Sequence, residues 1–496
     1  MVCRHGALQA LDRAAARAAA TGARRAPSSC AFHRGGCARG TLGAAGPCVG
    51  AVEIAVKSRI YGGPFVTQQK RTIAARSDCP FVLYNTFTRR REVFRSRVPG
   101  EVKLFTCGPS VYRRPHLGNY RTFLYEDVLQ RYLEYRGNRV HRVIVVTDVE
   151  DKALEEALSL DLSVQELTDR NVDFFRQECE ELGIALPDTM PRASTSVDVA
   201  ADLIQSLIER GVAYRHGNDV FYDPLKYSRF GELFGLDMRD WPAERRRFAQ
   251  DTYEGNRWNR GDFILWHGFR KGDQVWWDTP LGRGRPSWNV QDPAMCVQQA
   301  GYEIDIHCGG IDNLYRHHDY NRAVIEGVTG TEFCHYWLHG EHVIVEGSKM
   351  SKSKGNVLYL EHMAERGITP REVRFLLICG HYRDKLNITD QLIDERVALI
   401  RALRADVDLL LADADVRGDT RHPDPAVDAI IEELPVLFET AMNDDLRVAD
   451  AVPALRTALR QLRTLSGDRP VPPPAAVRLR ATLSAIDSVI GAIFAR

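Results

Sequence analysis

A strand, a helix and a second strand near residue 100 limit the possible folds of this chain more than any other feature. Residues 102–107 read as a strand, Gly108 and Pro109 break it, and a helical pattern of apolar residues follows His116. Residues 139–148 contain the run Val-Ile-Val-Val, which is typical of a strand buried on both faces. Because parallel strands need a helical crossover of this kind, the sequence predicts an α/β fold around a parallel sheet.

Further segments extend this pattern along the chain. We expect strands at 81–87 and 303–307, a hairpin at 213–222, and helices at 167–182, at 197–210 and near His317. Residues 227–284 are irregular in pattern, including 262–266 and Trp276-Trp277, so we expect an insertion there and no sheet strand. From residue 390 onward the pattern is helical, which is typical of a small helical bundle.

These segments predict a nucleotide-binding fold that is split in two by an insertion. The expected parts are a low-acidity tail at 1–76, the two halves of the α/β domain at 77–152 and 285–346, a helical and connective insertion at 153–284, a lysine-rich loop with a connecting segment at 347–392, and a helical bundle at 393–496. No separate domain is evident after the bundle.

Composition limits the cellular setting and the class of partner. Lys+Arg and Asp+Glu both total 66, so nothing global indicates a nucleic-acid-binding protein, and we expect no DNA partner. Any contact with another nucleic acid would need a local basic face. No apolar run has the length of a membrane span. Eleven scattered cysteines fit reduced thiols. The tail has Asp12 as its only acidic residue up to Gly50. We expect a cytoplasmic protein with a disordered or over-long tail; the alternative is an organellar transit peptide.

A lysine-rich loop at residues 347–356, Gly-Ser-Lys-Met-Ser-Lys-Ser-Lys-Gly-Asn, has the chemistry of a polyphosphate site. Lysine ammonium groups attract phosphate, serine hydroxyls donate hydrogen bonds, and glycine lets the backbone approach a ligand. The chain has no Gly-x-x-x-x-Gly-Lys-Ser/Thr sequence, which excludes a P-loop. The alternative interpretation is a solvated basic turn.

The order Lys349-Met350-Ser351-Lys352-Ser353 is identical to the KMSKS signature of class I aminoacyl-tRNA synthetases. That signature has a His-x-Gly partner upstream, and His116-Leu117-Gly118-Asn119 supplies it. From about Tyr84 to its end the chain resembles the cysteinyl-tRNA synthetase family. The matching stretches are residues 106–112, 115–119, 147–152, 191–193, 262–266, 284–286, 307–318, 349–356, 380–383 and 442–445.

The resemblance implies a fold, a reaction and a set of site residues. The fold is a Rossmann-like catalytic domain split by a connective insertion, with a stem-contact segment after the lysine loop and then a helical domain. The reaction is ATP-dependent activation of an amino acid, expected to be cysteine, as an aminoacyl-adenylate, with Mg²⁺ accompanying ATP and transfer to tRNA. The implied residues are catalytic His116, Lys349 and Lys352; ATP-binding Gly118, Asn119, Gly309, Gly310, Asp312, Met350, Ser351 and Ser353; and substrate-binding Cys107, Gly108, Tyr112, Thr147 and Trp288.

The resemblance also implies zinc, which in this family is held by two cysteines, a histidine and a glutamate. The matching positions here are Cys107, Asp292, His317 and Asn321, so two of the four side chains differ. A thiolate, a carboxylate and an imidazole can still form a three-ligand site, whereas a neutral amide is a poor replacement. Cys308 or His318 is a candidate to complete a rearranged set. The alternative is a metal-free pocket, and an apolar pocket separates near-isosteres by only about 10–200-fold.

Two other functions remain open from the sequence. The chain stops about where the family's small anticodon-reading domain begins, so the acceptor is either tRNA or a small-molecule amine or carrier, as in the related cysteine ligase of mycothiol synthesis. A third possibility is an inactive synthetase-like binding module. The presence of His116, Gly118, Lys349 and Lys352 argues against an inactive protein.

Overall fold

The computed structural model describes residues 79–187, 190–236, 262–350, 354–412 and 424–494, which all belong to one compact unit, Lys70–Arg496. The predicted tail at 1–76 and the loop residues Ser351, Lys352 and Ser353 lie outside the described residues.

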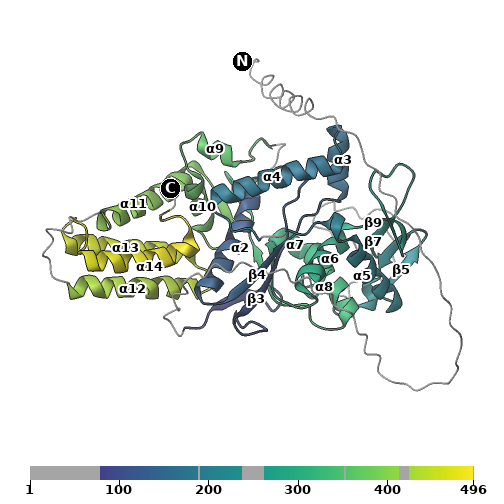
Figure 1. The fold of residues 1–496 in the computed structure, drawn as a ribbon, viewed down its shortest axis with the longest axis horizontal. Coiled ribbons are helices and arrows are strands. Elements are labelled where there is room, and N and C mark those ends of the chain that lie inside the picture. Colours follow the sequence, from purple (N-terminus) through teal and green to yellow (C-terminus); the bar gives the residue numbers. More distant parts are fainter. Residues whose placement is uncertain (1–78, 188–189, 237–261, 351–353, 413–423, 495–496) are drawn as a thin grey trace, which may run out of the picture. The chain divides into compact units, whose positions relative to one another are not determined.

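The centre of this unit is a four-stranded parallel sheet in the order β11-β10-β3-β4. One crossover helix, α2, joins β3 to β4, and α8 joins β10 to β11 (Figure 1). The predicted α/β fold with a parallel sheet is therefore confirmed. The bounds are β3 (Glu101–Thr106), α2 (Leu117–Tyr135), β4 (Arg139–Ile144), β10 (Ile304–Gly310), α8 (Asp319–Thr329) and β11 (Cys334–Gly340).

Side chains of the sheet alternate between two apolar layers. Leu104 and Ile306 belong to a core that includes Leu124 of α2. Phe105, one residue along β3, belongs to a second core with Met295 of α6 (Trp288–Ala300). Because both faces are covered, the strands read as continuous apolar runs in the sequence.

The insertion contains a five-stranded antiparallel sheet in the order β5-β6-β7-β9-β8. The expectation of irregular structure at 227–284 was therefore wrong for part of that segment. Phe263 and Trp266 are fully buried in β7, and Phe263 pairs with Tyr222 of β6. The bounds are β5 (Ala213–His216), β6 (Asp219–Tyr222), β7 (Phe263–Gly268), β8 (Trp277–Thr279) and β9 (Gly282–Pro286).

Other predicted elements are present with small shifts. The expected strand at 81–87 forms a hairpin, because β1 (Val82–Asn85) pairs antiparallel with β2 (Arg90–Val93). The insertion also carries the helices α3 (Asp151–Ser159), α4 (Val164–Leu182) and α5 (Val197–Glu209), and α9 (Leu360–Ala364) and α10 (Pro370–Ile378) follow the lysine loop.

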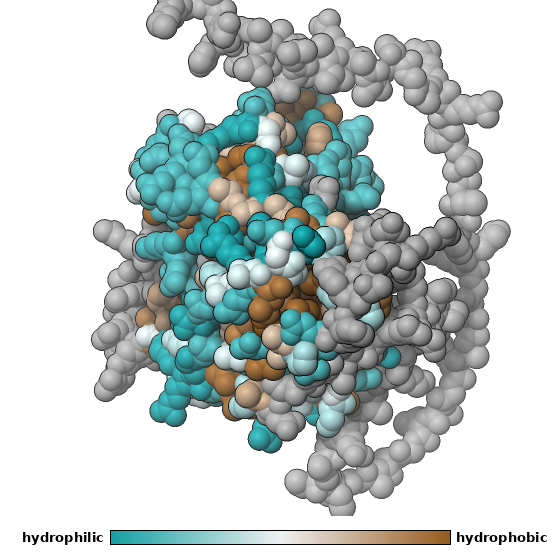
Figure 2. Space-filling view, turned by 90° about the vertical axis from the view of Figure 1, so that its left-hand side faces the viewer, coloured by the Kyte–Doolittle hydropathy of each residue, from teal (hydrophilic) through white to brown (hydrophobic). Residues whose placement is uncertain are grey.

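The predicted helical bundle is confirmed at the carboxyl end. It consists of α11 (Asp390–Leu410), α12 (Pro425–Met442), α13 (Val448–Ser466) and α14 (Pro473–Ile490), and α12 packs against both α13 and α14. Figure 2 shows this part of the unit, where apolar side chains lie among a mostly polar surface; exposed examples are Val436, Leu465 and Val477.

No helix in the described ranges is long and apolar enough to cross a membrane.

A buried ion pair connects this bundle to the sheet domain. Arg374 of α10 lies 2.6 Å from Asp127 of α2, and both side chains are fully buried. Arg374 Nε also donates to the carbonyl of Ile490, the last residue of α14, at 2.6 Å. Burial acts to raise the pKa of Asp127, but the opposing effect of Arg374 and Arg131 holds it below its usual value. The carboxylate therefore stays charged, and Arg374 joins α2, α10 and α14.

Replacing Arg374 with Met should lower the free energy of unfolding by about 3–5 kcal/mol, because the buried carboxylate of Asp127 would keep only the partly exposed Arg131 as a charged partner. Urea denaturation of the purified protein measures this change. The matched control is Arg447→Met, whose ion pairs with Asp444 and Asp450 are exposed and should contribute less than about 1 kcal/mol. Equal losses in the two variants would contradict the structural role of Arg374.

Candidate functional site

The candidate site lies where the connections of the parallel sheet diverge. From β3 the chain crosses to β4 at one edge of the sheet, and from β10 it crosses in the opposite direction to β11 at the other edge. Neighbouring strands β3 and β10 therefore end beside a crevice, which is where open α/β sheets bind ligands. Cys107 follows β3 directly, and His307 to Gly310 form the end of β10.

Strand register brings several of these side chains to one face of the sheet. His307 of β10 pairs with Phe105 of β3 and with Trp337 of β11, and Gly309 pairs with His339. Side chains two residues apart share a face. His307 and His339 therefore lie on the same side as Phe105, in the layer covered by α6 and α8.

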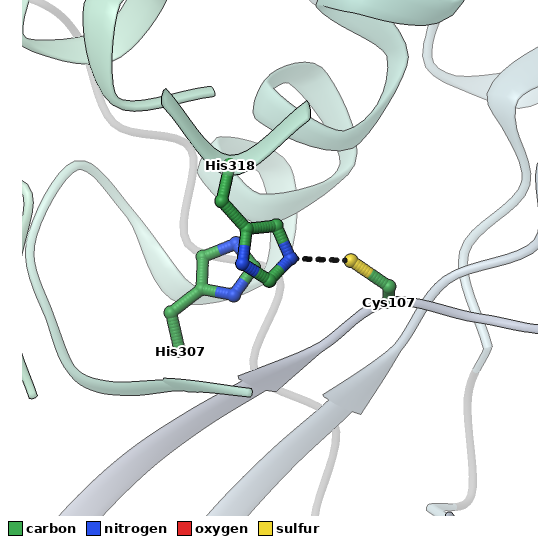
Figure 3. A group of neighbouring side chains, drawn as sticks. All are labelled: Cys107, His307 and His318. Carbon is green, nitrogen blue, oxygen red and sulfur yellow. Dashed lines mark hydrogen bonds between the residues drawn. The ribbon is translucent and has the colours of Figure 1, made fainter. Parts of the chain in front are cut away.

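A chain of hydrogen bonds links His339 to Cys107 through His318. Cys107 Sγ is 3.1 Å from Nε2 of His318, as Figure 3 shows. His318 Nδ1 is 2.8 Å from Nε2 of His339, and His339 Nδ1 is 3.0 Å from the Thr86 hydroxyl. Burial lowers the pKa of His318 well below its usual value and that of His339 to about 3. The imidazoles are therefore neutral at physiological pH.

A second group of side chains faces the same thiol. Asp292 Oδ2 on α6 lies 2.9 Å from His317 Nε2, which is within hydrogen-bond distance. The His317 ring stacks on Trp288 with 4.0 Å between ring centroids. Asn321 lies one helical turn after His317, and neither polar atom of its buried amide has a partner. The structure thus brings together Cys107, Asp292 and His317.

Two overlapping groups of donors at this place fit a transition-metal ion. The ligating atoms of Cys107, Asp292 and His317 lie within 4.8 Å of one another, and so do those of Cys107, His307 and His318. Unpartnered buried atoms are concentrated here: Asp292 Oδ1, His307 Nε2, His317 Nδ1 and both amide atoms of Asn321. Burial, followed by the charge of Asp292, raises the pKa of the Cys107 thiol well above its usual value. A bound cation would supply the missing positive charge, and a thiolate, carboxylate and imidazole set suits zinc.

The predicted phosphate-binding elements also meet in space. A Cβ added to Gly118 would lie 2.6 Å from the terminal methyl of Met350 and 3.0 Å from the His116 ring. The backbone N–H of Leu117 donates to the Leu358 carbonyl at 2.9 Å. The histidine turn and the lysine loop, about 230 residues apart in sequence, are therefore in contact, with Gly118 as the point of closest approach.

His116 itself is poised as a neutral donor or acceptor. Its backbone N–H donates to Asn119 Oδ1 at 3.0 Å, which fixes the start of α2. The ring Nδ1 has no partner, and burial lowers the pKa of the imidazole. Lys349 is exposed at the end of β13 (Ser348–Lys349), and this strand pairs with β12 (Val343–Val345).

The remaining expected residues are placed as follows. Gly309 lies close to the His318 ring: a Cβ added to this glycine would be 2.7 Å from His318 Cε1. A Cβ added to Gly310 would be 2.5 Å from Asp312 Oδ1. Thr147 is buried just past β4, and the Tyr112 ring contacts Arg113 and Lys152 through cation–π interactions.

The sequence interpretation assigned no role to His307 or His339, although both cluster with Cys107 and His318. Each is a histidine near the carboxyl end of a buried parallel strand. A polar residue of this kind in an otherwise apolar run is the signal that would have identified them.

Comparisons with known proteins agree with this fold. Residues 93–398 match the family of tRNA synthetases class I (C), catalytic domain. The chain is 31% identical over 423 residues to a cysteine–tRNA ligase of Protochlamydia amoebophila, covering 84% of this chain and 87% of the relative. It is 34% identical to a cysteine–tRNA ligase of Chlamydia muridarum, covering 77% and 79%. A methionyl-tRNA synthetase structure from Mycobacterium tuberculosis, in complex with methionyl-adenylate, has the same fold with a TM-score of 0.57 at 16% identity, covering 79% and 89%.

The position of Cys107 depends on the absence of a side chain at Gly108. An added Cβ there would lie 1.4 Å from the backbone carbonyl oxygen of Val145, and neither backbone can move without disturbing β3 or β4. Gly108→Ala should therefore lower the free energy of unfolding by about 1–3 kcal/mol or more. Denaturant unfolding tests this against Gly380→Ala, where the nearest atom is a Leu386 methyl at 3.9 Å. An unchanged midpoint for Gly108→Ala would show that the strand ends are more adaptable than this packing implies.

Proposed function

The chain belongs to the cysteine–tRNA ligase family of class I tRNA synthetases, and on this premise we propose that its site activates cysteine with ATP and passes the cysteinyl group to tRNA. The contact of the His116 turn with Met350 carries the proposal, since it brings two phosphate-binding sequences to one place. Enzymatic activity as an ATP-dependent ligase follows from the family.

The chemistry needs positive charge and hydrogen-bond donors around the α-phosphate. A carboxylate oxygen of the amino acid forms a bond to the α-phosphorus of ATP, the bond to the bridging oxygen breaks, and pyrophosphate leaves with that electron pair. Negative charge develops on the phosphoryl oxygens. We assign its stabilisation to a ring N–H of neutral His116 and to the ammonium groups of Lys349 and Lys352. One such contact is worth about 3 kcal/mol of barrier. Mg²⁺ would accompany the ATP phosphates.

Substrate positioning is assigned to the residues that the sequence predicted for it. For ATP these are Gly118, Asn119, Gly309, Gly310, Asp312, Met350, Ser351 and Ser353. For the amino acid they are Cys107, Gly108, Tyr112, Thr147 and Trp288. The stacking of Trp288 on His317 supports a role for Trp288 as a wall of the amino-acid pocket.

Zinc would bind at Cys107, the side chain common to both donor groups. The family's other positions are occupied here by Asp292, His317 and Asn321. When bound, zinc supplies a Lewis acid that prefers sulfur over the hydroxyl oxygen of serine. Cys107 would hold the ion, and the pocket walls would exclude bulkier amino acids.

The acceptor in this proposal is tRNA. The relatives covering most of the chain are named as tRNA ligases, and they give no support to a small-molecule amine. We further propose a cytoplasmic location, because every described cysteine is a free thiol, as is usual in a reducing compartment.

The catalytic assignment predicts a large effect at the loop lysine. Lys352→Ala should slow cysteine-dependent ATP–pyrophosphate exchange by roughly 100-fold without loss of folding, because one transition-state contact is removed. Lys385→Ala, which removes an exposed lysine outside the loop, is the matched control and should retain normal exchange. Exchange that is equally fast in both variants would refute the role of Lys352.

Substrate and acceptor are tested by pyrophosphate exchange with each of the twenty amino acids, followed by transfer to total tRNA. We expect exchange with cysteine and cysteine-charged tRNA as the product. Exchange without any charged tRNA would redirect the proposal to another acceptor, and absence of exchange with every amino acid would overturn it.

A further inference from the structure

His307 is a fully buried histidine with an unused nitrogen. Its ring lies 4.9 Å from Phe105, stacks on Trp337 at 4.7 Å, and lies 4.1 Å from the His318 ring, measured between centroids. Nδ1 is 3.3 Å from the Cys308 carbonyl, whereas Nε2 has no partner. Leaving such a buried group unsatisfied costs about 1–3 kcal/mol. A ligand for Nε2 would remove that cost.

The nearest donors to this nitrogen form a compact set. The ligating atoms of Cys107, His307 and His318 lie within 4.8 Å of one another (Figure 3). Zinc bonds sulfur at about 2.3 Å and nitrogen at about 2.0–2.1 Å, so ligands of one tetrahedral ion are about 3–4 Å apart. Small side-chain movements would therefore bring all three onto one ion.

The outer hydrogen bonds allow the proton arrangement that a metal requires. If Nδ1–H of His307 donates to the Cys308 carbonyl, Nε2 presents its lone pair. If His339 donates from Nδ1 to the Thr86 hydroxyl, its Nε2 can accept a hydrogen bond from Nδ1–H of His318. His318 Nε2 then presents its lone pair toward Cys107. Metal-bound imidazoles are usually oriented by an outer acceptor of this kind.

The competing group has this preparation only when Asp292 lies outside the ligand set. Its imidazole, His317, uses Nε2 to contact Asp292 Oδ2, and its Nδ1 has no partner. If Nδ1 bound the metal, Asp292 would orient the ring from outside. If Nε2 bound it, the ring would have no outer acceptor. The fourth family position, Asn321, contributes no charge.

We propose that Cys107, His307 and His318 form the transition-metal site of this chain, with zinc as the ion, and that Asp292 lies outside the ligand set. This inference rests on the proposed function only in taking zinc as the metal. One thiolate and two neutral imidazoles leave a net charge of 2 − 1 = +1 on the centre. The fourth position is open to a substrate thiolate, which would neutralise it.

X-ray absorption on the wild-type protein tests the ligand set without any substitution. Full-length protein is purified without chelator, and a second sample is stripped and reloaded with zinc sulfate. We expect one sulfur and two imidazoles around zinc in the absence of cysteine. A single imidazole with carboxylate oxygen, or failure to take up zinc in either sample, would overturn the proposal.

Paired variants give an independent readout through zinc affinity in a chelator competition. His307→Gln should weaken zinc binding by at least about tenfold, and His339→Gln, which removes only the outer partner of His318, by about 10–100-fold. Asp292→Asn should change affinity by less than about threefold. The opposite order, with Asp292→Asn losing zinc and both histidine variants retaining it, would place the ion on the competing group.

Folding and function are separated in the same preparations. Thermal unfolding of the stripped variants shows whether His307→Gln is folded. If it is not folded, the ligand set is judged from the X-ray absorption spectrum of the wild-type protein and from the zinc affinity of His339→Gln. Pyrophosphate exchange is measured alongside. Normal cysteine-dependent exchange in a wild-type protein with one imidazole on zinc would overturn this ligand set and leave the proposed function standing.

Discussion

The parallel pairing of β3 with β10 is the interaction on which the rest of this structure depends. The two strands are about 200 residues apart in sequence, and the whole antiparallel insertion lies between them. Their pairing places Cys107 near His307 of β10 and creates the crevice at the carboxyl ends of the two strands. Gly108 is part of the same constraint, because its backbone passes the Val145 carbonyl too closely for any side chain. The site is therefore a product of long-range sheet register.

This register concentrates polar groups in a layer that is otherwise apolar. Phe105, Val143 and Trp337 belong to a buried apolar core on the same face as His307 and His339. Buried polar atoms in such surroundings normally find partners, yet several around Cys107 have none. The packing alone gives no account of this pattern, whereas a bound ion and an amino acid would satisfy these atoms. These unpartnered atoms lower the local stability of the protein at the place where we expect the ion and the amino acid to bind.

The sequence predicted the parts of this molecule that are encoded locally. Strand and helix patterns around His116 predicted the α/β fold, and the signature at Lys349 led to the proposed nucleotide-binding elements. The sheet of the insertion was missed, because the strand at 263–268 depends on pairing with Tyr222 and its neighbours, about 40 residues earlier in the sequence. His307 and His339 were missed for a related reason, since strand register brings them together, next to His318.

Arg374 has a consequence for how this architecture can change in evolution. Its guanidinium joins Asp127 in the sheet domain to the Ile490 carbonyl in the bundle, yet it belongs to α10, before the first bundle helix begins at Asp390. A recombination that exchanged the bundle at that boundary would leave Arg374 behind and remove one of its acceptors. The bundle is therefore not a freely exchangeable module. A successful replacement must present a carbonyl to an arginine that it does not itself encode.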